Sequence, residues 1–175
     1  WQRRLEPLRY RIARRTLTPV LKAKYEEFEG ETLHHVDVLE QLIAGLGGDP
    51  MYVSPAARAT EKANTGLLES TFILAGSVDL MTQELVMLDA VLLAEAKDHA
   101  NWSCLASMVD SFPEGSLRGQ VRSAVERVES QEDEHLGWAQ DMRCKMISMQ
   151  ASSSAMTKVA AKAEETMATI KGWFT

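Results

Sequence analysis

The sequence predicts an all-helical protein whose helices pack as an antiparallel bundle. Only 5 of the 175 residues are Pro and 10 are Gly, so residues that interrupt helices are scarce. Three long segments carry apolar residues at alternating steps of three and four, the spacing that lines the seam between packed helices. The length suits one domain with a hydrophobic core, and we therefore expect residues 1–175 to form a single bundle domain.

Signals for helix ends divide the first part of the chain. Residues 1–18 are expected to hold a basic helix that begins near Pro7, because Pro is favoured in the first turn of a helix. A second helix is expected to begin at Thr18-Pro19, a capping residue followed by Pro. It ends before Gly47-Gly48-Asp49-Pro50, where Gly and then Pro stop it.

The remaining chain is expected to complete the bundle and to add one helix beyond it. Ser152–Ser154 are interpreted as the cap of a separate, shorter C-terminal helix, so the bundle core is placed within residues 19–150. Phe112–Gly115 form a turn between the last two long helices. The expected helices after the second one cover 55–69, 79–110, 117–150 and 152–173.

Each long apolar stripe also contains a carboxylate at an inward position. The stripes run through Leu21, Tyr25, Phe28, Glu31, His34 or His35, Val38 and Leu42; through Leu85, Leu88, Leu92, Glu95, His99, Trp102, Ala106 and Val109; and through Val121, Val125, Val128, Glu132, His135, Ala139, Met142, Met146 and Met149. A lone buried charge is costly, so these acids need a cation, a hydrogen-bond network or a metal ion. Internal salt bridges or half-exposed carboxylates are the alternative interpretation.

Two of these stripes hold a Glu-x-x-His motif, Glu31/His34 and Glu132/His135. The spacing places carboxylate and imidazole on one helix face within a single turn, so both project toward the same point. With Glu95 as a third inward carboxylate, the pattern predicts a metal site.

Two further histidines lie near this predicted site. His99 is either an extra ligand, a partner of a ligand, or a core histidine. His35 follows His34 but points about a hundred degrees away, so one of the two is expected not to bind metal.

On these motifs the chain resembles the ferritin-like superfamily over about residues 19–150. Residues 31–50 resemble the second helix of that family, 93–101 the third and 132–138 the fourth. The resemblance implies a ferritin-like antiparallel four-helix bundle with a long crossover and a short additional C-terminal helix. It also implies bridging roles for Glu31 and Glu132, and terminal positions for His34, His135 and Glu95.

The family also has a Glu in its first helix, and this sequence departs from that pattern. Glu6 is the only acid before the second helix, and a hairpin turning near Thr18 brings it level with Glu31. Pro7 follows Glu6 directly, and the first helix would be short. The alternatives to Glu6 as the first-helix ligand are a ligand upstream of Trp1, a missing ligand, or Glu27 as a weaker substitute.

The resemblance implies two bound iron ions, with manganese or a mixed or zinc pair as alternatives. The expected function is a non-haem di-iron or di-manganese oxidoreductase acting on dioxygen, peroxide or ferrous iron. A non-catalytic metal-storage subunit and a degenerate, metal-free interaction module remain alternatives, so the sequence leaves open whether the protein is an enzyme. A homo-oligomer, a dimer or larger, is expected, and a redox reaction would need a separate electron donor.

Charge and cysteine content narrow the expected partners and location. The formal net charge is −6, but residues 1–24 hold eight bases and one acid. No regular series of aromatic residues interleaves those bases as in single-strand nucleic-acid sites, so we expect a solvated or packed helix face and no nucleic acid. Cys104 and Cys144 form no CxxC pair, which favours a reducing cytoplasm, and no apolar run suggests a membrane partner.

Overall fold

All regular structure in the described residues is helical, as the sequence predicts. The structure is a computed structural model that describes residues 15–74 and 76–172. Residues 1–14, which include Glu6 and most of the predicted first helix, lie outside the described residues; Arg15–Leu17 are not helical. The elements are α2 (Pro19–Gly45), α3 (Pro55–Ile73), α4 (Leu80–Met108), the short 3-10 helix η1 (Val109–Ser111) and α5 (Ser116–Gly172).

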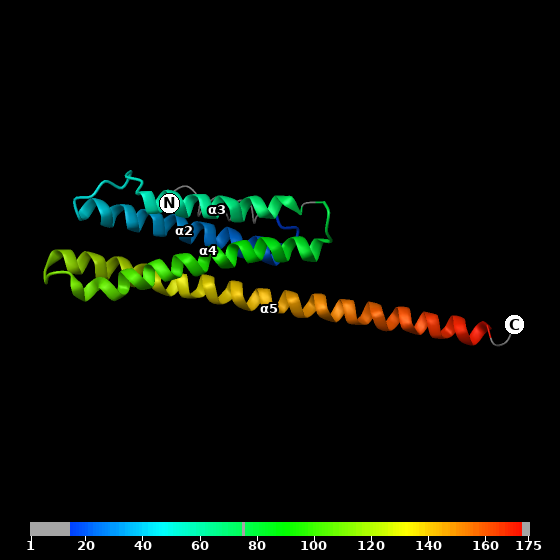
Figure 1. The fold of residues 1–175 in the computed structure, drawn as a ribbon. Helices are drawn as coiled ribbons and strands as arrows, with labels where there is room; N and C mark the ends of the chain where they lie inside the picture. Colours follow the sequence, from blue (N-terminus) through cyan, green and yellow to red (C-terminus); the bar gives the residue numbers. More distant parts are fainter. Residues whose placement is uncertain (1–14, 75, 173–175) are drawn as a thin grey trace.

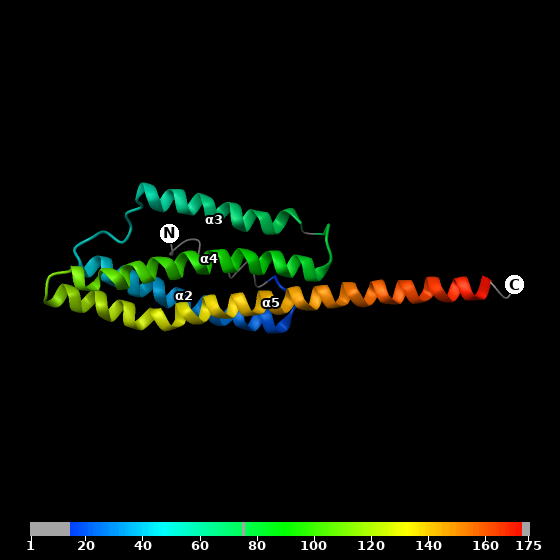
Figure 2. The same cartoon turned by 60° about the horizontal axis from the view of Figure 1, so that its bottom comes forward.

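The helices are arranged around α4 and α5, which pack along each other. α2 packs on α5, and α3 packs on α4 (Figure 1). α3, which follows α2 and precedes α4 along the chain, runs back along the bundle. α2 and α4 therefore point in the same direction (Figure 1). In Figure 2, α3 stands on the far side of α4 from α5. The predicted long connection after the second helix therefore contains a complete helix of 19 residues, longer than the expected 55–69.

Local signals explain where three helices begin and where α2 ends. Pro19 occupies the first turn of α2, and Gly47 follows the helix with φ of 78°, a conformation that favours Gly. The Ser54 side chain accepts a hydrogen bond from the Ala57 backbone N–H at the start of α3. The Asp79 side chain likewise accepts a hydrogen bond from the Thr82 backbone N–H at the start of α4.

The predicted break near Gln150 is wrong, because α5 continues for 57 residues without interruption. The hydroxyls of Ser152 and Ser153 donate to the carbonyls of Ser148 and Met149 one turn earlier, instead of capping a new helix. At 1.5 Å per residue the helix is about 85 Å long. Its C-terminal end projects beyond the other helices in both ribbon views (Figures 1 and 2).

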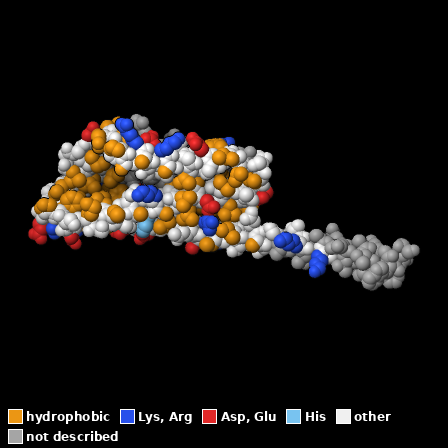
Figure 3. All heavy atoms as spheres, viewed as in Figure 1, with side chains coloured by type: hydrophobic (Ala, Val, Ile, Leu, Met, Phe, Trp, Pro, Cys, Tyr) orange, Lys and Arg blue, Asp and Glu red, His pale blue; other side chains and the backbone are white. Residues whose placement is uncertain are grey.

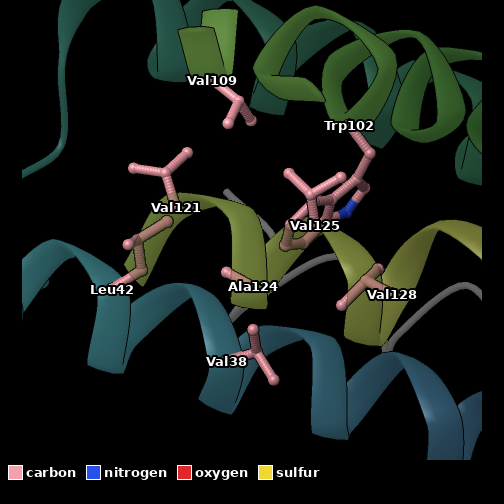
Figure 4. Packing of buried hydrophobic residues seen from close by; sticks show 8 residues of the cluster. All are labelled: Val38, Leu42, Trp102, Val109, Val121, Ala124, Val125 and Val128. Atoms are coloured by element: carbon pink, nitrogen blue, oxygen red, sulfur yellow. The ribbon is translucent and has the colours of Figure 1, made fainter. Parts of the chain in front are cut away.

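The core has two apolar layers with a polar layer between them. One apolar cluster contains Leu21, Tyr25, Phe28, Leu88, Val91, Ala139 and Met146. The other contains Val38, Leu42, Trp102, Val109, Val121, Ala124, Val125 and Val128 (Figure 4). Between them along α2, α4 and α5 lie the buried polar residues Thr32, His35, Glu95, Asp98, Glu132 and His135. Burial of each large apolar side chain contributes about 1.5–3 kcal/mol to the stability of the fold. The two apolar clusters therefore fix the helices that carry the polar layer.

The surface mixes charged, polar and hydrophobic side chains, and hydrophobic ones gather at both ends of the bundle on the face shown in Figure 3. Among the described residues, no helix has the length and apolar character needed to cross a membrane.

Candidate metal centre

Three helices bring acids and imidazoles together in the polar layer. Glu95 comes from α4, and Glu132 and His135 come from α5; one ligand atom of each lies within 4.8 Å of the others. His35 of α2 joins them, because its Nδ1 lies 2.7 Å from Oε1 of Glu132. All four side chains are at most 1% exposed. The buried layer therefore concentrates oxygen and nitrogen donors around one centre.

Gln131 fixes which ring nitrogen of His35 carries hydrogen. Its amide nitrogen lies 3.0 Å from Oε1 of Glu31, a carboxylate that can only accept, so the amide donates there. Its carbonyl oxygen then faces Nε2 of His35 at 2.9 Å and must receive a hydrogen from that ring. In a neutral imidazole, Nδ1 consequently turns a lone pair toward the carboxylate of Glu132. A proton, on the imidazole or on the carboxyl group, or a cation makes that contact favourable.

His135 faces carboxylates with both ring nitrogens. Nε2 lies 2.8 Å from Oε2 of Glu31, and Nδ1 lies 3.6 Å from Oε2 of Glu95. Burial by itself lowers the pKa of His135, but the hydrogen bond and charge of Glu95, the hydrogen bond to Glu31 and the charge of Glu132 outweigh it. The pKa is therefore raised above its ordinary value. The surroundings of this imidazole thus favour positive charge.

Aromatic contacts hold the imidazoles in place. The Phe28 ring lies 4.0 Å from the His135 ring, and Trp138 meets Phe28 edge-on at 5.4 Å between centroids. The His35 and His135 rings are stacked at 5.7 Å, and Trp102 lies 6.4 Å from His35. These neighbours restrict ring rotation and line the layer with apolar surface.

Among the predicted ligands, Glu95, Glu132 and His135 come together, and Glu31 stands at the edge. The Glu31 side chain is 25% exposed yet bonds His135. His34 is exposed and does not belong to the group, so its assignment as a ligand is corrected. The buried residues of α2 run through Phe28, Thr32 and His35, steps of four and three, which turns the second His inward.

The remaining predicted ligands do not reach the centre. His99 is partly exposed and pairs with Asp133, its Nδ1 3.2 Å from Oδ1, on the outer side of α4 and α5. Glu27 is exposed and binds Lys24. Glu6 lies outside the described residues.

Two other buried polar residues accompany the centre. Thr32 stands three residues before His35, where a Glu-x-x-His motif would have its Glu, and its buried hydroxyl has no hydrogen-bond partner among the described residues. Asp98 is fully buried one turn after Glu95 on α4. Asp98 lies three residues after Glu95, and this spacing could have indicated that it is also buried in the polar layer. For Thr32 and His35, the spacing from Phe28 by four and seven residues gives the same indication.

The donor set fits a transition-metal ion. Carboxylate oxygens and imidazole nitrogens suit iron, manganese and zinc. Two such ligands about 2.1 Å from an ion and at right angles to each other are about 3 Å apart. The contact of 2.7 Å between His35 Nδ1 and Glu132 Oε1 is close to that value. With His135 Nδ1 facing the Glu95 carboxylate, its Nε2 carries the hydrogen and donates to Oε2 of Glu31 at 2.8 Å. The described residues offer three carboxylates and two imidazoles, enough for one ion and part of the set for a second.

Comparison with known proteins adds no assignment: no protein-family model, no curated protein and no solved structure matches this chain significantly. The function is therefore inferred from the geometry of the polar layer.

Proposed function

We propose that the chain binds iron or manganese in its polar layer and acts as a non-haem oxidoreductase on dioxygen, peroxide or ferrous iron. The observation that carries the proposal is the orientation of the imidazoles. His35, held by Gln131, directs Nδ1 at Glu132, and His135 directs both ring nitrogens at carboxylates. A metal ion accepts such lone pairs and offsets the negative charge of the carboxylates at the same time.

Each residue has a distinct part in this proposal. Glu95, Glu132 and His135 would hold one ion. Glu132 also contacts His35, so Glu132 and His35, with Glu31 nearby, would hold a second ion. A bound iron or manganese ion supplies a redox centre with coordination positions open to dioxygen or peroxide.

The surrounding residues prepare the site without binding metal. Gln131 links Glu31 to His35 and keeps both in position. Phe28 covers the His135 ring, and the apolar layers on either side exclude water from reactive oxygen species.

Metal analysis of paired variants tests the proposal. Protein produced with added iron or manganese is measured by plasma mass spectrometry as wild type and as Glu132→Ala plus His135→Ala. We expect the double variant to retain less than about half of the wild-type metal, because two donors of one ion are removed, while helical circular dichroism persists.

The matched control is Glu134→Ala plus His99→Ala, which removes an exposed acid and a half-exposed imidazole next to the site. Its metal content should equal that of wild type. Unchanged metal in the Glu132/His135 variant would refute the site. Oxygen consumption with ferrous iron or peroxide then separates an oxidoreductase from a storage subunit, which would also need a large closed oligomer visible by light scattering.

A specific observation supports a metal-free alternative. Protonated His35 and His135 would satisfy Glu132, Glu31 and Glu95 directly, and the raised pKa of His135 is in keeping with that state. The bundle would then be an interaction module with a buried ionic network. Protein that binds no metal after supplementation would favour this second function.

A further inference from the structure

A second candidate site lies at the end of the bundle where α2 and α4 begin. It is a pocket of about 400 Å³, within the range of small-molecule sites. Its rim is exposed at Val20, Leu80 and Met149, whereas Leu21 and Met146 on its inner wall are buried. The lining residues are Thr18, Val20, Leu21, Leu80, Met81, Glu84, Met142, Met146 and Met149. The pocket is therefore largely apolar and open to solvent on one side.

Among the described residues that line this pocket, Glu84 is the one with a charged side chain, and it is 1% exposed. Its Oε1 accepts hydrogen bonds from the Leu17 backbone N–H at 2.9 Å and from the Thr18 hydroxyl at 3.4 Å. Its Oε2 is buried and has no hydrogen-bond partner in the part of the chain that the structure describes. A half-bonded carboxylate in apolar surroundings is unfavourable, and a donor inside the pocket would relieve it.

We propose that this pocket binds a small primary ammonium compound with an apolar chain. The ammonium head donates to Oε2 of Glu84, where opposite charge strengthens the hydrogen bond. The chain lies against the four methionines of the lining, whose flexible side chains adapt to different shapes.

The site is separate from the metal centre. Met142 of the pocket and His135 of the centre are two turns apart on α5, on the order of 10 Å along the helix. Tyr25 lies in the apolar cluster between them, and burial and the charge of Glu84 raise the pKa of its hydroxyl. Ammonium binding therefore goes beyond the proposed function and does not require metal.

Methyl NMR of protein labelled at its nine methionines tests the proposal. The probes are n-octylammonium, n-octanol and n-octanoate at neutral pH. We expect octylammonium to shift the signals of Met81, Met142, Met146 and Met149 and to leave those of Met51 and Met108 unchanged. It should bind about tenfold more tightly than octanol, and octanoate should not bind.

Two variants separate the head-group contact from the pocket itself. Glu84→Gln keeps an oxygen for the Leu17 N–H, so the fold is retained, but the preference for octylammonium over octanol should disappear. Met146→Trp should fill the pocket and abolish binding of both probes. Glu129→Gln, an exposed acid elsewhere on α5, should behave as wild type.

Three outcomes would overturn the proposal. They are the absence of shifts at millimolar octylammonium in wild type, equal affinities for octylammonium and octanol, and an unchanged preference in Glu84→Gln. Metal content is measured on the same samples, so failure of this site and failure of the metal centre are told apart.

Discussion

At the scale of single residues, one amide decides what the polar layer can bind. Gln131 donates to Glu31 and must accept from Nε2 of His35, and this leaves Nδ1 of His35 pointing at Glu132. The arrangement orients the imidazole for a cation as residues behind metal ligands do. It therefore makes His35, rather than His34, the imidazole that α2 contributes.

The two neighbouring histidines give a matched pair of variants. We expect His35→Ala to lower metal content to below about half of wild type, because it removes one of the imidazole donors that face Glu132 and the other carboxylates. His34→Ala should leave metal content unchanged, since that side chain is exposed. Plasma mass spectrometry of both variants checks this, and equal metal loss in the two would contradict the assignment.

The same pair shows how far the sequence predicts the site. Glu95, Glu132 and His135 could be grouped from spacing because each lies on a regular apolar stripe. On α2 the stripe steps from Phe28 by either three or four residues, and only packing selects Thr32 and His35 over Glu31 and His34. Asp98 was assigned no metal-binding role, although it is fully buried one turn after Glu95.

At the scale of elements, Pro, Gly and capping residues located the helices, whereas serines were misleading. The predicted start at Thr18-Pro19 is confirmed, with Pro19 the first residue of α2, although the Thr18 side chain makes no capping hydrogen bond. The expected starts at residues 55 and 79 agree with Pro55 and Leu80 to within one residue. A Ser hydroxyl can cap a helix or bond back to a carbonyl one turn earlier, and the sequence alone does not distinguish the two. In α5 the second pattern occurs, so the predicted separate C-terminal helix is part of one continuous helix.

We predict that the bundle folds and binds metal independently of the part of α5 that begins at Ser153. Ser153→Pro removes a helical hydrogen bond and clashes with the preceding turn, at a cost of about 3 kcal/mol. Because both core clusters end by Met146, we expect helicity to fall while metal content and cooperative unfolding of the bundle remain.

Ser123→Pro is the matched control, since Ser123 is an exposed residue of α5 that lies between the core residues Val121 and Val125. That variant should lose cooperative unfolding and metal. Circular dichroism, thermal unfolding and metal analysis of both proteins provide the comparison. Loss of metal in Ser153→Pro would mean that the part of α5 from Ser153 onward supports the site.

At the scale of the whole molecule, the layers explain why a charged centre is compatible with a stable bundle. Apolar clusters on both sides hold α2, α4 and α5 at fixed positions, and the polar layer joins the same three helices. Contacts between the acids and the imidazoles offset part of the free-energy cost of removing these groups from water. A metal ion at this point would connect all three helices and bind only the folded chain.

Metal should consequently stabilise the whole fold. An ion at a hundred times its dissociation constant contributes about 2.7 kcal/mol of unfolding free energy. For a chain of this length, 1 kcal/mol corresponds to about 2–4 °C, so we expect manganese to raise the Tm of metal-free protein by about 5–10 °C. Glu132→Ala plus His135→Ala should show no rise, and Mg²⁺ should act weakly because it binds imidazole poorly. Calorimetry with and without chelator measures the shift, and an equal rise in wild type and variant would place the ion elsewhere on the molecule.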